Sequence, residues 1–245
     1  MKQILLIVFT ALLWFKMPIR AQEVLITGTE LLKRSISFHD PNGQWAAIRL
    51  ELVLDQEMPD GSKRPSNVII DNKRSEFELS FVKNNHLFTW KVDGRDSTAS
   101  FMDYRVVTDS IASDSLGLNP DRARRWRNYY SYLYGLPMKL TDPGTKIDPQ
   151  VQMTKFDNKD VLALKVTYDA KVGKDTWYFY FNPDTYAMEG YRFFHDEAKN
   201  DGEYILISGL EIQNGLRIPK DRAWYTNDES KWLGTDRFIE MKVIK

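Results

Sequence analysis

The stretch that decides the fold is Lys174-Asp-Thr-Trp-Tyr-Phe-Tyr-Phe-Asn182, in which five aromatic residues follow one another from Trp177 to Phe181. Successive side chains of a β-strand point to opposite faces, so a strand here carries large rings on both faces. We therefore expect cover against each face of this strand. A second aromatic group, from Trp126 to Tyr134, is the candidate for one of those covers.

Outward from this run, the C-terminal half reads as a meander of strands. Turn sequences such as Asn182-Pro-Asp184 and Asn214-Gly215 separate the apolar runs at a spacing that suits antiparallel neighbours. The predicted strands of this half are Val151–Phe156, Val161–Tyr168, Lys174–Phe181, Tyr186–His195, Gly202–Ile212, Leu216–Tyr225 and Trp232–Val243.

The N-terminal half begins with a predicted short helix over Glu30–Phe38, whose apolar residues share one arc of a helical wheel. From Trp45 the period changes to two, because Ile48, Leu50, Leu52 and Leu54 alternate with Arg49, Glu51 and Val53. Further strands are predicted around Val68 and Ile70, over Phe77–Phe81, over Leu87–Val92 and, less regularly, over Ala99–Thr108.

A second helix is predicted over Pro120–Tyr134. Asn119 supplies a capping side chain, Pro120 suits the first helical position, and Gly135 ends the helix. Its apolar arc is aromatic and also contains Arg122, whereas Arg124, Arg125 and Arg127 lie outside that arc.

Together these patterns predict a mainly β (α+β) fold. We expect a single curved antiparallel sheet of about eleven or twelve strands that forms an incomplete barrel. The short N-terminal helix and the central aromatic helix complete it, and the aromatic helix covers the concave side.

The first residues resemble an export signal rather than part of the fold. Lys2 precedes an apolar run of 12 residues, Ile4–Phe15, which is too short to span a bilayer. We expect a signal peptide over residues 1–21 and one domain over 22–245, placed in the periplasm or secreted. A retained membrane anchor is the alternative.

The composition excludes several classes of protein. The chain has no cysteine, which excludes disulfides, a lipid-modified N-terminal cysteine and thiolate chemistry. The whole chain has 34 Lys and Arg against 34 Asp and Glu. Near-neutral charge gives no electrostatic argument for nucleic acid, and no cofactor motif is present.

Several motifs resemble an uncharacterised family of exported bacterial proteins with a domain of unknown function. They are Tyr129-Tyr-Ser-Tyr-Leu-Tyr-Gly-Leu-Pro-Met138, Asp142-Pro-Gly-Thr145, Lys174–Phe181, Ser37-Phe-His-Asp-Pro-Asn-Gly43 and Phe193-Phe-His-Asp-Glu197. The order of elements is also similar to the periplasmic lipoprotein-carrier (LolA-like) half-barrels. That second resemblance implies an apolar cavity that holds acyl chains.

The first functional hypothesis is a non-enzymatic binding protein for an apolar small molecule or lipid. Its candidate site joins the aromatic helix to the aromatic strand, with Arg122 oriented towards a polar head. The expected ligand-binding residues are Arg122, Trp126, Tyr129, Tyr130, Tyr134, Trp177, Phe179 and Phe181. Two alternatives stay open here: the rings fill an ordinary core, and Arg122 extends to solvent.

Other hypotheses use other residues. A packed scaffold with an envelope protein partner predicts an exposed aromatic patch around Trp224, Tyr225 and Trp232. A hydrolase would use His39 or His195, each of which is followed by an aspartate that also suits a turn. The four arginines near Arg122 offer an anionic membrane contact.

Overall fold

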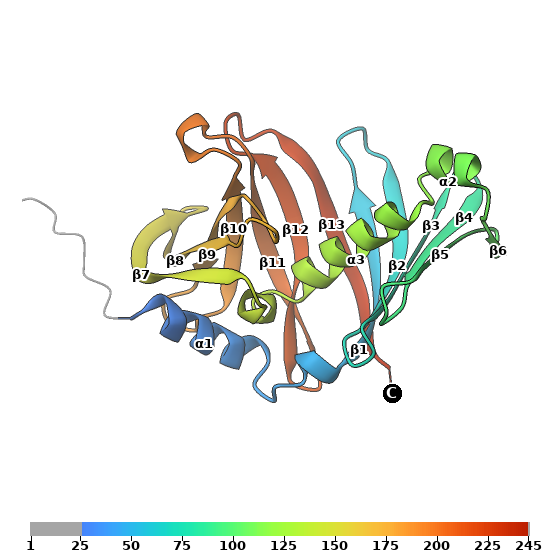
Figure 1. Ribbon diagram of the computed structural model, residues 1–245. Helices are drawn as coiled ribbons and strands as arrows, with labels where there is room; N and C mark the ends of the chain where they lie inside the picture. Colours follow the sequence, from blue (N-terminus) through green and yellow to red (C-terminus); the bar gives the residue numbers. More distant parts are fainter. Residues whose placement is uncertain (1–25, 245) are drawn as a thin grey trace, which may run out of the picture.

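The structure is a computed structural model that describes residues 26–244 (Figure 1). The strands are β1 (Arg49–Glu57), β2 (Lys63–Asp71), β3 (Glu76–Lys83), β4 (His86–Val92), β5 (Thr98–Met102), β6 (Arg105–Val106), β7 (Thr145–Phe156), β8 (Lys159–Tyr168), β9 (Thr176–Phe181), β10 (Met188–Phe194), β11 (Glu203–Gln213), β12 (Leu216–Thr226) and β13 (Trp232–Val243). The helices are α1 (Gly28–His39), α2 (Ser110–Leu116) and α3 (Pro120–Tyr134), with short 3-10 helices η1 (Trp45–Ala47), η2 (Met138–Thr141) and η3 (Glu197–Lys199).

All 13 strands belong to one antiparallel sheet, which confirms the predicted fold class. Their order is β6-β5-β4-β3-β2-β1-β13-β12-β11-β10-β9-β8-β7. Two meanders therefore meet where the first strand pairs with the last, with Leu50 opposite Val243. The sheet stays open, with β6 and β7 at its two edges, and α3 runs across its concave side in Figure 1.

The hairpins follow from turn residues that tolerate a left-handed backbone. Asn84 and Asn85 both have positive φ, at 51° and 63°, between β3 and β4. Asn214 and Gly215 do the same, at 53° and 87°, between β11 and β12. Two successive positive φ values match the right-handed twist of the flanking strands. These turns hold the meander in register.

Helix α3 begins and ends where the sequence predicts. The Asn119 side chain accepts a hydrogen bond from the Arg122 backbone N–H at 2.9 Å, and Pro120 occupies the first turn. Helix α1 is capped in the same way by Thr27 and runs slightly longer than the predicted Glu30–Phe38. Both caps satisfy N–H groups that have no partner inside the helix.

The core lies between the concave face, α1 and α3. Leu50, Leu52 and Leu54 alternate into it from β1, and Phe179 and Phe181 enter it from β9 without any exposure. These side chains come from both meanders, so one apolar interior joins the two halves of the sheet.

The outer face of β9 is covered differently from our expectation. Tyr180 packs in a small second cluster whose members all come from strands, and its ring stacks on Phe156 with centroids 4.0 Å apart. Gly190 lies opposite Tyr180 on β10 and leaves room for the Phe156 ring. The outer aromatic rings therefore cover one another, and no further element is needed against this face.

Two details of the prediction were wrong. The stretch Ala99–Thr108 is not one strand, because Asp103 and Tyr104 have positive φ and turn the chain between β5 and β6. This turn raises the strand count from the predicted eleven or twelve to 13. Helix α2 was not predicted, since only seven mostly polar residues form it between the cap Asp109 and the left-handed Gly117.

The predicted signal peptide over residues 1–21 lies outside the described part of the chain. Within residues 26–244, no helix combines the length and the apolar character needed to cross a membrane.

Candidate functional site

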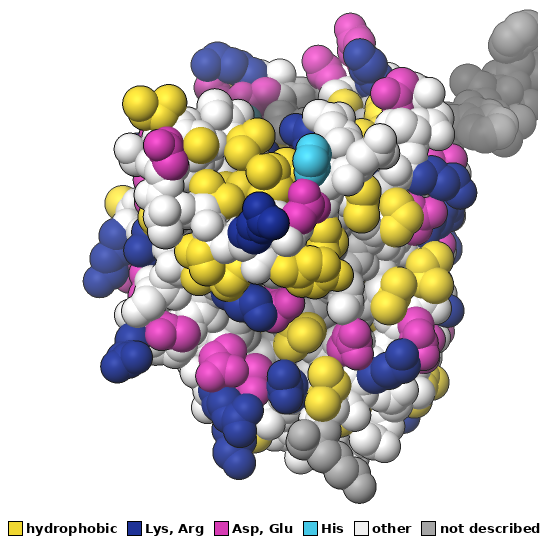
Figure 2. All heavy atoms as spheres, turned by 90° about the vertical axis from the view of Figure 1, so that its right-hand side faces the viewer, with side chains coloured by type: hydrophobic (Ala, Val, Ile, Leu, Met, Phe, Trp, Pro, Cys, Tyr) yellow, Lys and Arg dark blue, Asp and Glu magenta, His cyan; other side chains and the backbone are white. Residues whose placement is uncertain are grey.

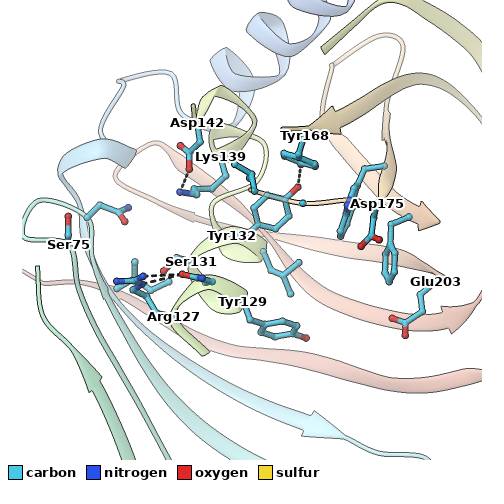
Figure 3. A pocket seen from close by; sticks show the side chains of 18 of the residues that line it. Ser75, Arg127, Tyr129, Ser131, Tyr132, Lys139, Asp142, Tyr168, Asp175 and Glu203 are labelled. Atoms are coloured by element: carbon cyan, nitrogen blue, oxygen red, sulfur yellow. Dashed lines mark hydrogen bonds and ion pairs between the residues drawn. The ribbon is translucent and has the colours of Figure 1, made fainter. Parts of the chain in front are cut away.

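A pocket of about 890 Å³ opens beside the C-terminal half of α3 (Figure 3). Tyr129, Tyr132 and Leu133 of α3 form one wall. The opposite wall comes from strands β8 to β12, and the turn between β2 and β3 closes the far end. This volume falls in the range of small-molecule sites.

The pocket wall is aromatic. Trp177 stacks on Phe193 with ring centroids 4.8 Å apart, and Tyr132 meets Trp177 edge-on at 5.8 Å. The hydroxyl of Tyr132 is hydrogen-bonded to that of Tyr168, a contact drawn in Figure 3. This hydrogen bond pairs the two hydroxyl groups with each other, and both phenols line the cavity.

Under α3 the aromatic wall changes to a buried polar layer. Tyr129 stacks on Trp224 at 6.1 Å, and its hydroxyl reaches the carboxylate of Asp236 at 3.5 Å. Asp236 is 3 % exposed, and burial raises its pKa above the ordinary value. Arg222, its cross-strand partner on β12, lowers that pKa in part.

Charged groups line the rim of the pocket mostly as pairs. Asp175 holds His195 at 2.8 Å, and this hydrogen bond raises the pKa of the histidine. Lys139 of η2 pairs with Asp142, which follows that helix, as Figure 3 shows. Glu203 stands apart from these pairs, and its pKa is raised mainly by burial.

Of the eight residues predicted to bind ligand, the structure brings Tyr129 and Trp177 to the pocket wall. Tyr130, Tyr134, Phe179 and Phe181 lie buried in the core behind that wall. Trp126 packs on Trp90 at 6.3 Å in the aromatic cluster under the first half of α3. Helix α3 therefore contacts β9 through Tyr132, which the wheel places outside the apolar arc.

Arg122 is exposed on the first turn of α3, and its guanidinium carbon lies 5.0 Å from the Trp126 ring centroid. It does not line the pocket. Two neighbours outside the arc, Arg124 and Arg127, bind Asp96 at 2.9 and 2.6 Å. Those two arginines therefore fasten α3 to the β4–β5 turn.

The two histidines of the hydrolase hypothesis differ in environment. His39 is fully buried: Nδ1 donates to the Arg217 carbonyl at 2.7 Å, and Nε2 accepts the Met188 N–H at 3.0 Å. Burial lowers the pKa of His39 to about 4, so the ring is neutral and both nitrogens are occupied. Within residues 26–244, His195 is hydrogen-bonded to Asp175 and to no hydroxyl group.

No group of three or more His, Asp or Glu side chains in the described chain could hold a metal ion. The aspartates that follow the two histidines cap local turns. Asp40 accepts the N–H groups of Gln44 and Trp45, and Asp196 accepts that of Ala198.

Sequence reasoning missed several pocket residues. Tyr168, Phe193 and Trp224 line the cavity together with Tyr132 and Glu203. Strand alternation assigns these rings to the concave face, but it does not show which of them remain uncovered by α3.

The exposed apolar surface also differs from the predicted patch. Trp224 lines the pocket, Tyr225 stacks on Tyr204 across the sheet, and Trp232 donates to Thr235. Exposed apolar side chains gather instead near β6 and α2, the end that faces the viewer in Figure 2. They include Tyr104, Val106 and Ile111.

The fold is an open antiparallel half-barrel with a helix across its concave side and an aromatic pocket beside that helix. This architecture is LolA-like. The chain belongs to the family of unknown function DUF6503, which it matches over residues 6–241.

Solved structures support the same architecture. The chain is similar to a LolA superfamily protein from Nitrosomonas europaea, with 11% sequence identity and a TM-score of 0.53. That match covers 90% of this chain and 94% of the other. A putative outer membrane lipoprotein-sorting protein domain from Vibrio parahaemolyticus is 9% identical, with a TM-score of 0.51 and coverage of 86% and 91%. At these identities the likeness concerns the fold. A comparison with curated proteins found no match.

Proposed function

We propose that this protein is a non-enzymatic binding or carrier protein for an apolar or acylated ligand. The pocket beside α3 carries the proposal, because its walls are aromatic and its volume of about 890 Å³ accommodates an acyl chain. Apolar surface removed from water contributes about 25 cal/mol per Å² before the costs of ordering the ligand. The fold shared with lipoprotein-sorting proteins supports this function.

We propose that the N-terminal segment directs export of this chain. The pocket would then bind its ligand in the periplasm or outside the cell. Of the residues expected from sequence, Tyr129 and Trp177 would contact the ligand directly. Tyr130, Tyr134, Phe179 and Phe181 would support the wall from behind. Arg122 and Trp126 would contribute only where a ligand extends along α3 to its first turn.

The test is lipid extraction and native mass spectrometry of the purified protein, followed by calorimetric titration with decanol. Ser131 lies on the pocket wall of α3, so Ser131→Trp fills part of the cavity. We expect this variant to lose bound lipid and to weaken decanol binding about tenfold. Ser115→Trp, on the exposed face of α2, is the matched control. Equal decanol binding by Ser131→Trp and Ser115→Trp would contradict the assignment of the ligand to this pocket.

A second function, contact with an envelope protein, is supported by the exposed side chains near β6 and α2. Ile111 is 81% exposed and Tyr104 is 86% exposed, which is unusual for large apolar residues. The double variant Tyr104→Ser and Ile111→Ser tests it by crosslinking in cell envelopes. Loss of a crosslinked species relative to wild type supports the contact, and an unchanged crosslinking pattern contradicts it.

A further inference from the structure

Glu203 is the one half-buried carboxylate of the pocket that has no ion pair and no hydrogen bond within residues 26–244. The other acidic residues of the lining that are not fully exposed have partners. Asp71 has Arg49 and Asp175 has His195. A carboxylate removed from part of its water without a partner is unfavourable, and a bound ligand can supply that partner.

Strand register surrounds this carboxylate with rings on the concave face. Phe193 lies directly opposite Glu203 on β10, and Trp177 lies opposite Phe193 on β9. On the other side, Trp224 occupies the diagonal position, two residues before the direct partner Thr226. Direct cross-strand neighbours have Cβ atoms about 5 Å apart and diagonal ones about 7 Å apart.

The charge balance at this end of the pocket is negative. Asp175 and Glu203 lie on the same side of the cavity in Figure 3, away from Arg127. His195 is hydrogen-bonded to Asp175, and even when protonated it carries one positive charge against the two carboxylates. The two other cationic side chains of the lining are paired elsewhere, Arg127 with Asp96 and Lys139 with Asp142.

From this arrangement we propose that the pocket selects an amphiphile with a positively charged ammonium head, held by Glu203 over the rings of Trp177 and Phe193. The inference rests on the proposed function, since the apolar chain of the amphiphile occupies the aromatic cavity. A cation within about 6 Å of an aromatic centroid is attracted by the negative face of the ring. A carboxylate beside the same rings adds a charge-assisted hydrogen bond.

Other head groups fit this end less well. A carboxylate or phosphate head would meet Glu203 and Asp175 with like charge. A neutral hydroxyl gains one hydrogen bond but neither the ion pair nor the ring attraction. The pocket should therefore rank ammonium above hydroxyl, and hydroxyl above carboxylate.

The test compares four ligands by isothermal titration calorimetry below their micellar concentrations. Decylammonium, decanol and decanoate share a chain and differ in the head, while butylammonium retains the head and shortens the chain. We expect decylammonium to bind about tenfold more tightly than decanol, which corresponds to about 1.4 kcal/mol. Decanoate should bind most weakly of the three decyl ligands.

Glu203→Gln keeps the shape of the side chain and removes its charge. This variant should lose most of the tenfold preference for decylammonium while its affinity for decanol stays within about twofold of wild type. Glu203→Asp should retain part of the preference. Glu76→Gln is the matched control, because Glu76 lines the opposite end of the same pocket.

The outcomes separate this inference from the proposed function. Equal binding of the three decyl ligands, or an equal loss for all three in Glu203→Gln, overturns the ammonium site and leaves the apolar pocket intact. Butylammonium binding as tightly as decylammonium supports the ammonium site and contradicts the proposed acyl-chain function. No binding by any of the four ligands overturns both.

Discussion

Arg222 donates a hydrogen bond from Nη2 to the backbone carbonyl oxygen of Leu133 at 3.0 Å and so joins β12 to the last turn of α3. The carbonyls of the last helical turn have no partner within the helix. Arg222 is 1 % exposed, and its guanidinium carbon lies 4.0 Å from the ring centroid of Tyr134. A buried cation thus completes a helix end through hydrogen bonds to backbone oxygens.

Replacing this arginine should destabilise the fold. Arg222→Met keeps much of the volume but leaves the Leu133 carbonyl buried without a donor, which costs about 1–3 kcal/mol. We expect urea denaturation to show a loss of about 2 kcal/mol in the free energy of unfolding. Arg237→Met, at an arginine paired on the surface with Glu57 and Asp221, should change stability by less than about 1 kcal/mol. Equal losses in the two variants would contradict this role.

His39 should make the fold sensitive to mild acid. Its pKa is lowered to about 4 by burial, whereas an unfolded histidine titrates near the ordinary value of 6.5. Below pH 6.5 the unfolded chain binds a proton that the folded chain does not. Stability from this group is therefore complete above pH 6.5 and falls as the pH drops towards 4.

The expected loss between pH 7.5 and pH 5 is about 2 kcal/mol from His39 alone. Urea denaturation of the wild type and of His39→Gln at both pH values measures it. The variant is less stable at either pH, but its stability should change by about 2 kcal/mol less between them. The same pH dependence in both proteins would show that His39 is not responsible.

Much of the architecture could be predicted because its signals are local. The alternation of Leu50, Leu52 and Leu54 identifies a half-buried strand, and Asn119 followed by Pro120 fixes the start of α3 to the residue. Asn214-Gly215 marks a hairpin through backbone conformations that few other residues adopt. Each of these features depends on a few neighbouring residues.

The pocket could not be predicted in the same way because it depends on contacts distant in sequence. The pairing of Leu50 with Val243 joins the two meanders into one sheet, yet no short motif encodes it. Tyr132 lies outside the apolar arc of α3, yet it contacts Trp177 of β9, because the helix is covered from more than one direction. Glu203 lies beside Phe193 only through the β10–β11 register.

Gly190 should be one of the least replaceable glycines. A Cβ built there would lie 2.4 Å from the Phe156 ring and 2.6 Å from the Ile205 carbonyl oxygen. Gly190→Ala should therefore cost about 1–3 kcal/mol through displacement of these groups. Thermal or urea denaturation measures the loss, and Gly173→Ala, where the nearest atom is 3.5 Å away, is the control.

A second substitution separates the two close contacts of Gly190. In the background Phe156→Leu, the smaller side chain relieves the ring contact but not the backbone contact. The cost of Gly190→Ala should then fall by about 1 kcal/mol, because neighbouring residues are energetically coupled. An unchanged cost would assign the whole effect to the Ile205 carbonyl.

The hydrogen bond between Asp175 and His195 should determine the pKa of His195, and through it the pH dependence of ligand binding. The hydrogen bond to Asp175 raises the pKa of His195, with smaller contributions from the charges of Asp201 and Glu203. The stability gained from this pairing is complete below the unfolded pKa and is lost as the pH rises through the folded one. In the variant Asp175→Asn, the pKa of His195 should fall back towards its ordinary value. NMR titration of the imidazole ring measures this change, with His86, which pairs with Asp103, as the internal control.

Deprotonation of His195 also changes the charge of the pocket end by one negative unit. Decylammonium should therefore bind more tightly as the pH rises through the pKa of His195, while decanol binding should stay constant. In His195→Gln this rise should disappear, because the variant lacks the imidazole that loses the proton. An affinity that rises equally in wild type and variant would place the titrating group elsewhere and contradict the assignment of this end of the pocket to the ammonium head.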